Sequence, residues 1–164
     1  MIRNILLVSL LLGLSPTVTL AQQVAAKPIG RFLTVRSPID DTVIGVQVRT
    51  WRDYQRRYRK YYIPAAKRLR RLMENVDDNA RFFVVSDNDD IAPSLATEFG
   101  EARVIHFPRT TARADSWQSA DGITEDLIDM LLLARTQRLF ASYLSTFSET
   151  AWWLGGATAA VWAF

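Results

Sequence analysis

The sequence predicts one α/β domain with a mostly parallel sheet and helices on both faces. Short apolar stretches, rich in β-branched and aromatic residues, alternate with stretches whose apolar residues recur at helical spacing. This alternation is typical of βαβ units, in which helices connect parallel strands. The length of 164 residues, with 49% hydrophobic and 23% charged residues, is enough for one hydrophobic core.

Five stretches are predicted as strands. Val43–Arg49 (VIGVQVR) and Arg81–Ser86 (RFFVVS) are nearly continuous apolar runs, as expected for strands buried within a sheet. The other three predicted strands are Arg103–Phe107, Leu139–Ser142 and Ala159–Phe164.

Helices are predicted between these strands. The first begins at Pro64, because proline is favoured in the first helical turn. Apolar residues follow at helical spacing, namely Ala65, Ala66, Leu69, Leu72, Met73 and Val76, and the other face is basic, with Lys67, Arg68, Arg70 and Arg71. The later helices are expected over about Pro93–Phe99, ended by Gly100, about Ile123–Ala134, and Phe147–Leu154, ended by Gly155 and Gly156.

The N-terminal residues 1–21 have the pattern of a targeting segment. Arg3 precedes the apolar run Ile5–Leu14, and Thr19–Ala21 supplies the small residues of a cleavage site. A short membrane anchor is the alternative, although Ser15–Thr17 breaks the run below the roughly 20 residues that a spanning helix needs. We therefore expect a signal peptide or short anchor over 1–21, a lead segment over 22–42 and the folded domain over 43–164. The expected location is the secretory pathway, with the protein either in the Golgi or ER lumen or secreted.

The composition excludes several kinds of chemistry. The chain has no cysteine, so it contains no disulfide and no thiolate site. His106 is the single histidine, which rules out the usual histidine-pair metal spacings. The sequence also lacks the Gly-x-Gly-x-x-Gly and P-loop motifs that would indicate a dinucleotide or kinase-type site.

Polar and charged residues follow the predicted strands at their carboxyl ends, where parallel sheets bind ligands. These strand ends are Arg49–Arg52, Asp87–Asp89, His106–Arg109 and Ser142–Ser148. The last of them combines hydroxyl side chains with a predicted helix start, which is a favourable site for an anion such as phosphate. A cation beside that helix start suits a diphosphate, and a carboxylate nearby suits the N–H edge of guanine.

Three segments resemble the recurring motifs of the fucosyltransferase superfamily that includes the α1,2, α1,6 and protein O-fucosyl enzymes. They are IGVQVRTWRD, VVSDNDD and GITEDLIDMLLLARTQRLFASYLSTFSETAWWLGG, and together they extend from about Val43 to Gly156. The resemblance implies a Rossmann-like domain equivalent to the C-terminal half of a GT-B fold, which binds GDP-fucose as donor without a metal. It implies no assignment for a catalytic residue, and the glycan or protein acceptor stays unknown.

The same resemblance implies roles for individual residues. Arg49 matches the arginine that contacts the diphosphate, Gln47 stands where many members have a histidine, and Asp87 matches the acidic residue that recognises guanine. Ser145, Thr146, Phe147 and Ser148 match the loop that lies along the diphosphate, while Asp129 matches a helical aspartate with a structural role. The acceptor-binding half of a GT-B enzyme is missing from the sequence, so we expect an incomplete enzyme or a non-catalytic remnant that still binds nucleotide.

Each of these residues also has a structural interpretation. Asp87 can cap a loop, Arg49 can be a solvated charge, and Ser145–Ser148 can be an ordinary helix cap. The pair Trp152 and Trp153 is expected to pack in the core.

An alternative function rests on the basic segment Arg49–Arg71. It contains half of the chain's 20 Lys and Arg residues, interleaved with Trp51, Tyr54, Tyr58, Tyr61 and Tyr62. Basic residues mixed with aromatic ones can bind single-stranded nucleic acid. The second hypothesis is therefore a secreted module that binds nucleic acid or another polyanion.

Overall fold

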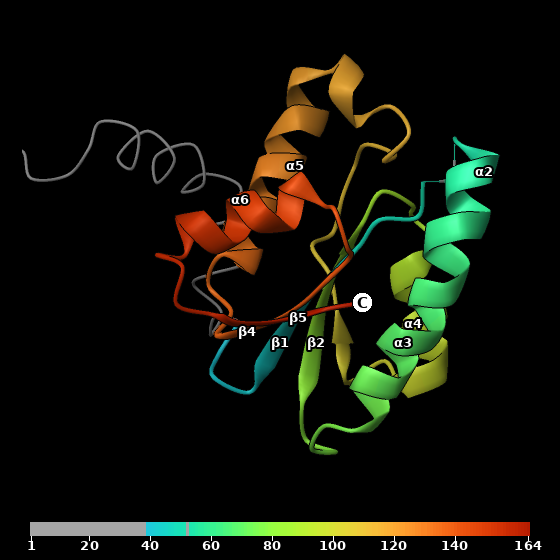
Figure 1. The fold of residues 1–164 in the computed structure, drawn as a ribbon. Helices are drawn as coiled ribbons and strands as arrows, with labels where there is room; N and C mark the ends of the chain where they lie inside the picture. Colours follow the sequence, from blue (N-terminus) through green and yellow to red (C-terminus); the bar gives the residue numbers. More distant parts are fainter. Residues whose placement is uncertain (1–38, 52) are drawn as a thin grey trace, which may run out of the picture. The chain divides into compact units, whose positions relative to one another are not determined.

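The computed structural model describes residues 39–51 and 53–164, which belong to one compact unit (Figure 1). The predicted signal peptide or anchor, and all but the last residues of the lead segment, lie outside the described residues. In the described part of the chain, no helix has the length and apolar character needed to cross a membrane.

The sheet has five strands, and every pair of neighbouring strands is parallel. Its order is β3-β2-β1-β4-β5, with bounds Val43–Val48 for β1, Arg81–Ser86 for β2, Val104–Ile105 for β3, Arg138–Ala141 for β4 and Ala160–Ala163 for β5. The chain runs outward from β1 to β3 and then crosses to the other side of β1. The prediction of a mostly parallel α/β sheet is confirmed, and the topology switches direction between β1 and β4.

Helices cover the sheet on both faces. Figure 1 shows α3 (Ile63–Glu74) and α4 (Ile91–Phe99) on one side, and α5 (Ala120–Leu133) and α6 (Thr146–Leu154) on the other. The main core forms where Ile44, Val46 and Val48 of β1 pack with Leu69 and Met73 of α3. The alternate residue Gly45 faces the end of α5, where an added Cβ would lie 2.6 Å from Thr136 Oγ1. Side chains of β1 therefore alternate between two buried faces, which explains its nearly continuous apolar sequence.

The helical segment before β2 is longer than the sequence predicts. It starts with α2 (Gln55–Arg57), continues as the π-helical turn η1 (Tyr58–Tyr62) and runs directly into α3. The expectation that the helix begins at Pro64 is therefore wrong, although Pro64 does lie in the first turn of α3. The Ile63 N–H donates to the Tyr58 carbonyl, five residues back. This wider turn relieves the clash that a proline ring makes with the carbonyl four residues before it in a regular helix.

The remaining boundaries differ from the predictions by a few residues. Helix α5 starts at Ala120, three residues early, because Ser119 caps it: the Gly122 N–H donates to Ser119 Oγ at 3.0 Å. Strand β3 is only Val104–Ile105, and α4 starts at Ile91. The core assignment for the tryptophan pair is wrong for Trp153, which is 63% exposed, because Ser148 and Ala151 form the buried face of α6.

Candidate functional site

A pocket of about 240 Å³ lies at the carboxyl edge of the sheet, where β1 and β2 end. We call it the central pocket. Four residues singled out by the sequence line it together: Gln47 from β1, Arg49 just after β1, Asp87 just after β2, and Phe147 from the first turn of α6. Residues far apart in the sequence therefore meet beside the point where the strand order reverses, which is the usual place for a ligand in such sheets.

Gln47 is a buried polar residue of the central pocket. It is 3% exposed, and its Oε1 atom has no hydrogen-bond donor among the described residues. A buried carbonyl oxygen without a partner costs about 1–3 kcal/mol, so the position favours a ligand that brings an N–H or O–H group. The amide side chain does not titrate, so its hydrogen-bonding character is independent of pH.

Asp87 holds the loop that follows β1. Its carboxylate accepts the Thr50 N–H at 2.7 Å and the Trp51 N–H at 3.2 Å, and it lies 3.4 Å from Arg49 Nε. The carboxylate therefore caps a loop from another strand. The Ser86 hydroxyl also donates to Oδ1 at 3.5 Å, so each carboxylate oxygen has two neighbouring donors, and a ligand N–H would replace the longer contacts to Ser86 and Arg49.

Arg49 is fixed through its backbone and open at its side chain. Its N–H donates to Ser142 Oγ at 2.8 Å, which connects the ends of β1 and β4. Its side chain is 42% exposed, so the guanidinium is accessible to a ligand while Asp87 orients it. This combination suits recognition of a phosphate or another anion.

The start of α6 supplies backbone donors next to the central pocket. Ser145 occupies the cap position, and no side chain caps the helix. In residues 39–51 and 53–164, the N–H groups of Thr146, Phe147 and Ser148 have no acceptor. The Ser148 hydroxyl, however, is turned inward and donates to the Ser145 carbonyl at 2.9 Å. The helix start thus offers an anion site through backbone N–H groups more than through the hydroxyls.

Ser145, Thr146 and Ser148 do not line the central pocket, whereas Phe147 between them does. The sequence reasoning missed several other lining residues: Asp53, Ser116, Trp117 and, most of all, Arg113 and Asp126. Asp53 and Asp126 lie within the segments that resemble the family motifs, but the resemblance assigns them no role. Arg113, Ser116 and Trp117 come from the polar stretch between β3 and α5, which no motif covers.

A buried ionic cluster anchors that loop. Arg109 and Arg113 both pair with Asp129 of α5, at 3.1 Å and 2.8 Å, and Arg109 also pairs with Asp126 at 2.8 Å. Burial raises the pKa of Asp129, while the charges of Arg113 and Arg109 act in the opposite direction. The structural role that the sequence analysis assigned to Asp129 agrees with its position, fully buried below the pocket.

Glu125 completes the cluster. Its carboxylate accepts the Thr110 N–H and hydroxyl, both at 2.7 Å, and the Thr111 N–H at 3.1 Å. Burial raises its pKa, but the hydrogen bonds from Thr110 and Thr111 and the charge of Arg109 outweigh that effect, so the pKa lies below its usual value. The loop that carries Arg113 into the central pocket is therefore held at both of its threonines.

An outer pocket of about 200 Å³ adjoins the central pocket. It contains His106 and Asp89 and shares Ser86 and Arg113 with its neighbour. Among the described residues, no group of three or more His, Asp or Glu side chains is arranged to hold a metal ion. The two pockets thus lie side by side along the carboxyl edge of the sheet, and both positively and negatively charged side chains line them.

The strand order, the parallel register and the pockets at the switch point define a Rossmann-like α/β domain. Its fold is similar to part of a fucosyltransferase. The structure of selenomethionine-labelled fucosyltransferase NodZ from Bradyrhizobium matches with a TM-score of 0.53 and 20% identity, over 79% of this chain and 40% of that one. A second NodZ structure from Bradyrhizobium matches with a TM-score of 0.52 and 19% identity, over the same shares of the two chains.

A NodZ α-1,6-fucosyltransferase structure co-crystallised with GDP also matches, with a TM-score of 0.50 and 20% identity, again over 79% of this chain and 40% of that one. This chain therefore spans well under half of the NodZ chain. The likeness shows a fucosyltransferase-like fold that resembles part of a GT-B fold. No protein-family model and no curated protein matches the sequence.

Proposed function

We propose that this chain binds a guanosine diphosphate sugar, GDP-fucose, as the donor-binding part of a fucosyltransferase-like glycosyltransferase. The observation that carries the proposal is the meeting of Gln47, Arg49, Asp87 and Phe147 in the central pocket. The similarity of the fold to a fucosyltransferase that was co-crystallised with GDP supports the same function. The proposal includes no metal, because the diphosphate charge is met by Arg49 and by the start of α6.

Each part of the donor has a proposed partner. The diphosphate lies between the Arg49 guanidinium and the free N–H groups of Thr146, Phe147 and Ser148. The guanine N–H groups donate to the Asp87 carboxylate in place of its two longest contacts, Ser86 Oγ at 3.5 Å and Arg49 Nε at 3.4 Å. A hydroxyl of the ribose or of the sugar donates to Gln47 Oε1, which satisfies its buried oxygen.

The choice of base tests this arrangement. Guanine presents two adjacent N–H donors to one carboxylate and uracil does not, so we expect calorimetric titration to show tighter binding of GDP than of UDP. The same titration with single-stranded DNA addresses the polyanion hypothesis. Equal affinities for GDP and UDP would remove Asp87 from the base site, because a diphosphate alone would then account for the binding.

The exposed basic helix favours a second candidate function, the binding of a polyanion. Arg56, Arg57, Arg59, Lys67 and Arg71 are all exposed along α2, η1 and α3. Attraction of this kind releases counterions and weakens steeply with salt. Binding of GDP in the central pocket should depend on salt far less than binding of single-stranded DNA does. The predicted secretory location stays a proposal that accompanies both functions.

A further inference from the structure

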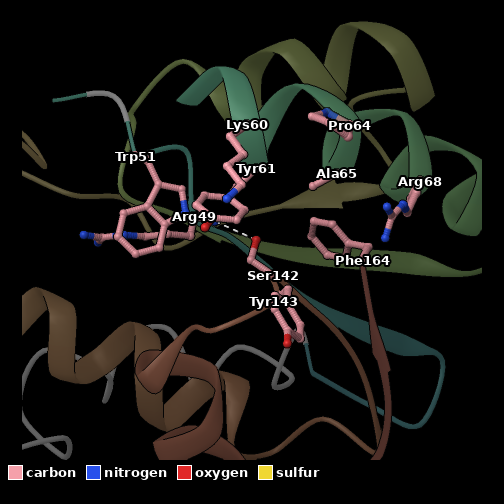
Figure 2. Close-up of a pocket in the computed structure, with 10 residues that line it drawn as sticks. All are labelled: Arg49, Trp51, Lys60, Tyr61, Pro64, Ala65, Arg68, Ser142, Tyr143 and Phe164. Atoms are coloured by element: carbon pink, nitrogen blue, oxygen red, sulfur yellow. Dashed lines mark hydrogen bonds between the residues drawn. The ribbon is translucent and has the colours of Figure 1, made fainter. Parts of the chain in front are cut away.

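A second pocket lies on the other side of Arg49 from the central pocket, between the ends of β1 and β4 and the helical segment η1–α3 (Figure 2). Its volume is about 310 Å³, in the range of a small-ligand site. We call it the cationic pocket. Its lining includes three cations and four aromatic residues, which are Arg49, Lys60 and Arg68, and Trp51, Tyr61, Tyr143 and Phe164.

One side of the helical segment supplies most of this wall. Lys60 and Tyr61 come from the π-helical turn η1, and Arg68 lies two turns further along in α3. Figure 2 shows these residues on the side of the helix that faces Arg49 and Ser142. π-Helical turns are rare and occur often at functional sites. Here the turn aligns Lys60 with Arg68 along one wall.

The charged side chains that line the cationic pocket are all positive. None of its lining residues is acidic. In the described part of the chain, Lys60 and Arg68 have no carboxylate within ion-pair distance, and Arg49 pairs only with Asp87. The central pocket, by contrast, contains Asp53, Asp87 and Asp126. The cationic pocket therefore favours a ligand with a negative charge.

Trp51 forms the aromatic side of the pocket from a strained backbone. Its φ angle is 57°, in the left-handed region that bulky residues rarely adopt, and Asp87 holds its N–H. Its ring centroid lies 4.9 Å from Arg49 Cζ and 6.4 Å from the ring centroid of Tyr61. Arg57 Cζ also lies 5.0 Å from the Trp51 centroid and Lys60 Nζ lies 5.1 Å from that of Tyr61, so the protein's own cations pack on these two rings. The exposed ring of Tyr143 is the aromatic surface that a sugar with an anionic substituent can contact.

We propose that the cationic pocket binds an anionic saccharide, a sugar with a sulfate, phosphate or carboxylate group, as the acceptor of the transfer. The acceptor role rests on the proposed function, since Arg49 lines both pockets and so places the two ligands side by side. In the transfer, an acceptor hydroxyl oxygen bonds to C1 of fucose and the bond from C1 to the β-phosphate oxygen breaks. GDP leaves, and the hydroxyl proton is released to water.

The test is a titration of the full chain at fixed ionic strength with N-acetylglucosamine 6-sulfate, N-acetylglucosamine 6-phosphate and neutral N-acetylglucosamine, followed by calorimetry. We expect the anionic sugars to bind at least about tenfold more tightly than the neutral one, because a charged hydrogen bond is gained. The double variant Lys60→Gln, Arg68→Gln should bind the anionic sugars at least about tenfold more weakly than wild type and bind GDP with unchanged affinity.

The matched control is Lys67→Gln, Arg71→Gln, which removes the same charges from exposed positions of α3 outside the pocket. It should leave all affinities unchanged, and equal losses in the two double variants would overturn the proposal in favour of diffuse attraction. Equal binding of neutral and anionic sugars would overturn it too, as would a loss of GDP binding in the Lys60, Arg68 variant, which would make the pocket part of the donor site.

Two further outcomes separate this site from its alternatives. In the first, a single-stranded oligonucleotide displaces the anionic sugar, and its affinity falls only in the Lys60, Arg68 variant. This result would assign the pocket to nucleic acid and overturn the proposal of a saccharide ligand. A wild-type chain that binds the anionic sugars and not GDP would contradict the proposed function and the acceptor role together. Thermal unfolding of each variant shows whether the fold is retained.

Discussion

Among single residues, Arg49 is the side chain on which the proposed donor site most depends. Its guanidinium is exposed enough to reach a ligand, and Asp87 and Ser142 fix its position from two strands. Asp87 keeps its two backbone donors when Arg49 is changed, so a substitution at Arg49 tests ligand binding with little effect on the loop.

We expect Arg49→Ala to weaken GDP binding by about 10- to 150-fold, since a hydrogen bond to a charged group contributes roughly 1.5–3 kcal/mol. Arg49→Lys should restore only part of the affinity, because the planar fork of the guanidinium is lost. Calorimetry in one buffer measures both variants. Arg71→Ala is the control, because Arg71 is exposed on α3 away from the central pocket. If Arg71→Ala weakens GDP binding as strongly, and salt abolishes both effects, the donor site is wrong.

At the scale of elements, the loop between β3 and α5 determines the shape of the central pocket. It is attached to α5 through Glu125, Asp126 and Asp129, and it carries Arg113 and Trp117 into the pocket. Because Asp129 is fully buried, removal of its charge would take away the shortest ion pair of Arg113 and leave Arg109 with Asp126 and Glu125 alone. The cluster therefore contributes to stability and to the geometry of the site at once.

The pH dependence of stability tests this attachment. Since the pKa of folded Glu125 lies below its reference value of 4.5, the folded state binds fewer protons there than the unfolded state, and stability rises with pH. The contribution is complete above about pH 4.5 and is lost as the pH falls through the folded pKa.

We expect Glu125→Gln to lower the unfolding free energy by about 1–3 kcal/mol at pH 7, because two backbone donors and one hydroxyl lose a charged acceptor. The difference from wild type should shrink below about pH 4.5. Urea unfolding between about pH 3 and 7 measures this difference, because that range includes the reference pKa values of carboxyl groups. A difference that stays constant over that range would mean that Glu125 acts through packing and not through its charge.

At the scale of the whole molecule, this chain corresponds in fold to 40% of the NodZ chain. The described residues line the proposed donor pocket and the cationic pocket, where Lys60, Arg68 and Tyr143 are exposed. Positioning of an acceptor against the donor supplies roughly 7–11 kcal/mol of a barrier when both are held closely.

We therefore expect the purified chain to bind GDP but to transfer fucose from GDP-fucose slowly or not at all. Release of GDP in the presence of N-acetylglucosamine 6-sulfate measures the transfer, and a sample without acceptor corrects for hydrolysis. Rapid transfer to any glycan would contradict this expectation and show that these residues position the acceptor without a second domain.

The sequence by itself determined the class of fold. The apolar strands Val43–Arg49 and Arg81–Ser86 and the helical spacing between them were sufficient, because a sheet covered on both faces needs strands that are apolar on both sides. The strand ends also indicated Arg49, Asp87 and the segment Ser142–Ser148 that contains Phe147, since carboxyl ends of parallel strands meet at one edge, and the resemblance to fucosyltransferases added Gln47. The sequence did not indicate the helical start at Gln55, because a proline at position 64 usually marks a helix start and a π-helical turn has no clear sequence pattern.

The tertiary structure alone decided which side chains meet across long distances in the chain. Asp87 caps the loop at Thr50 and Trp51, and Arg109 and Arg113 pair with Asp129; no local pattern indicates either pairing. The cationic pocket is of the same kind, because Arg68 of α3 meets Ser142 and Tyr143 only after β4 has been placed beside β1. Local propensity and periodicity act over one or two turns, whereas these contacts depend on the order of strands in the sheet, and that order is set by the packing of the whole domain.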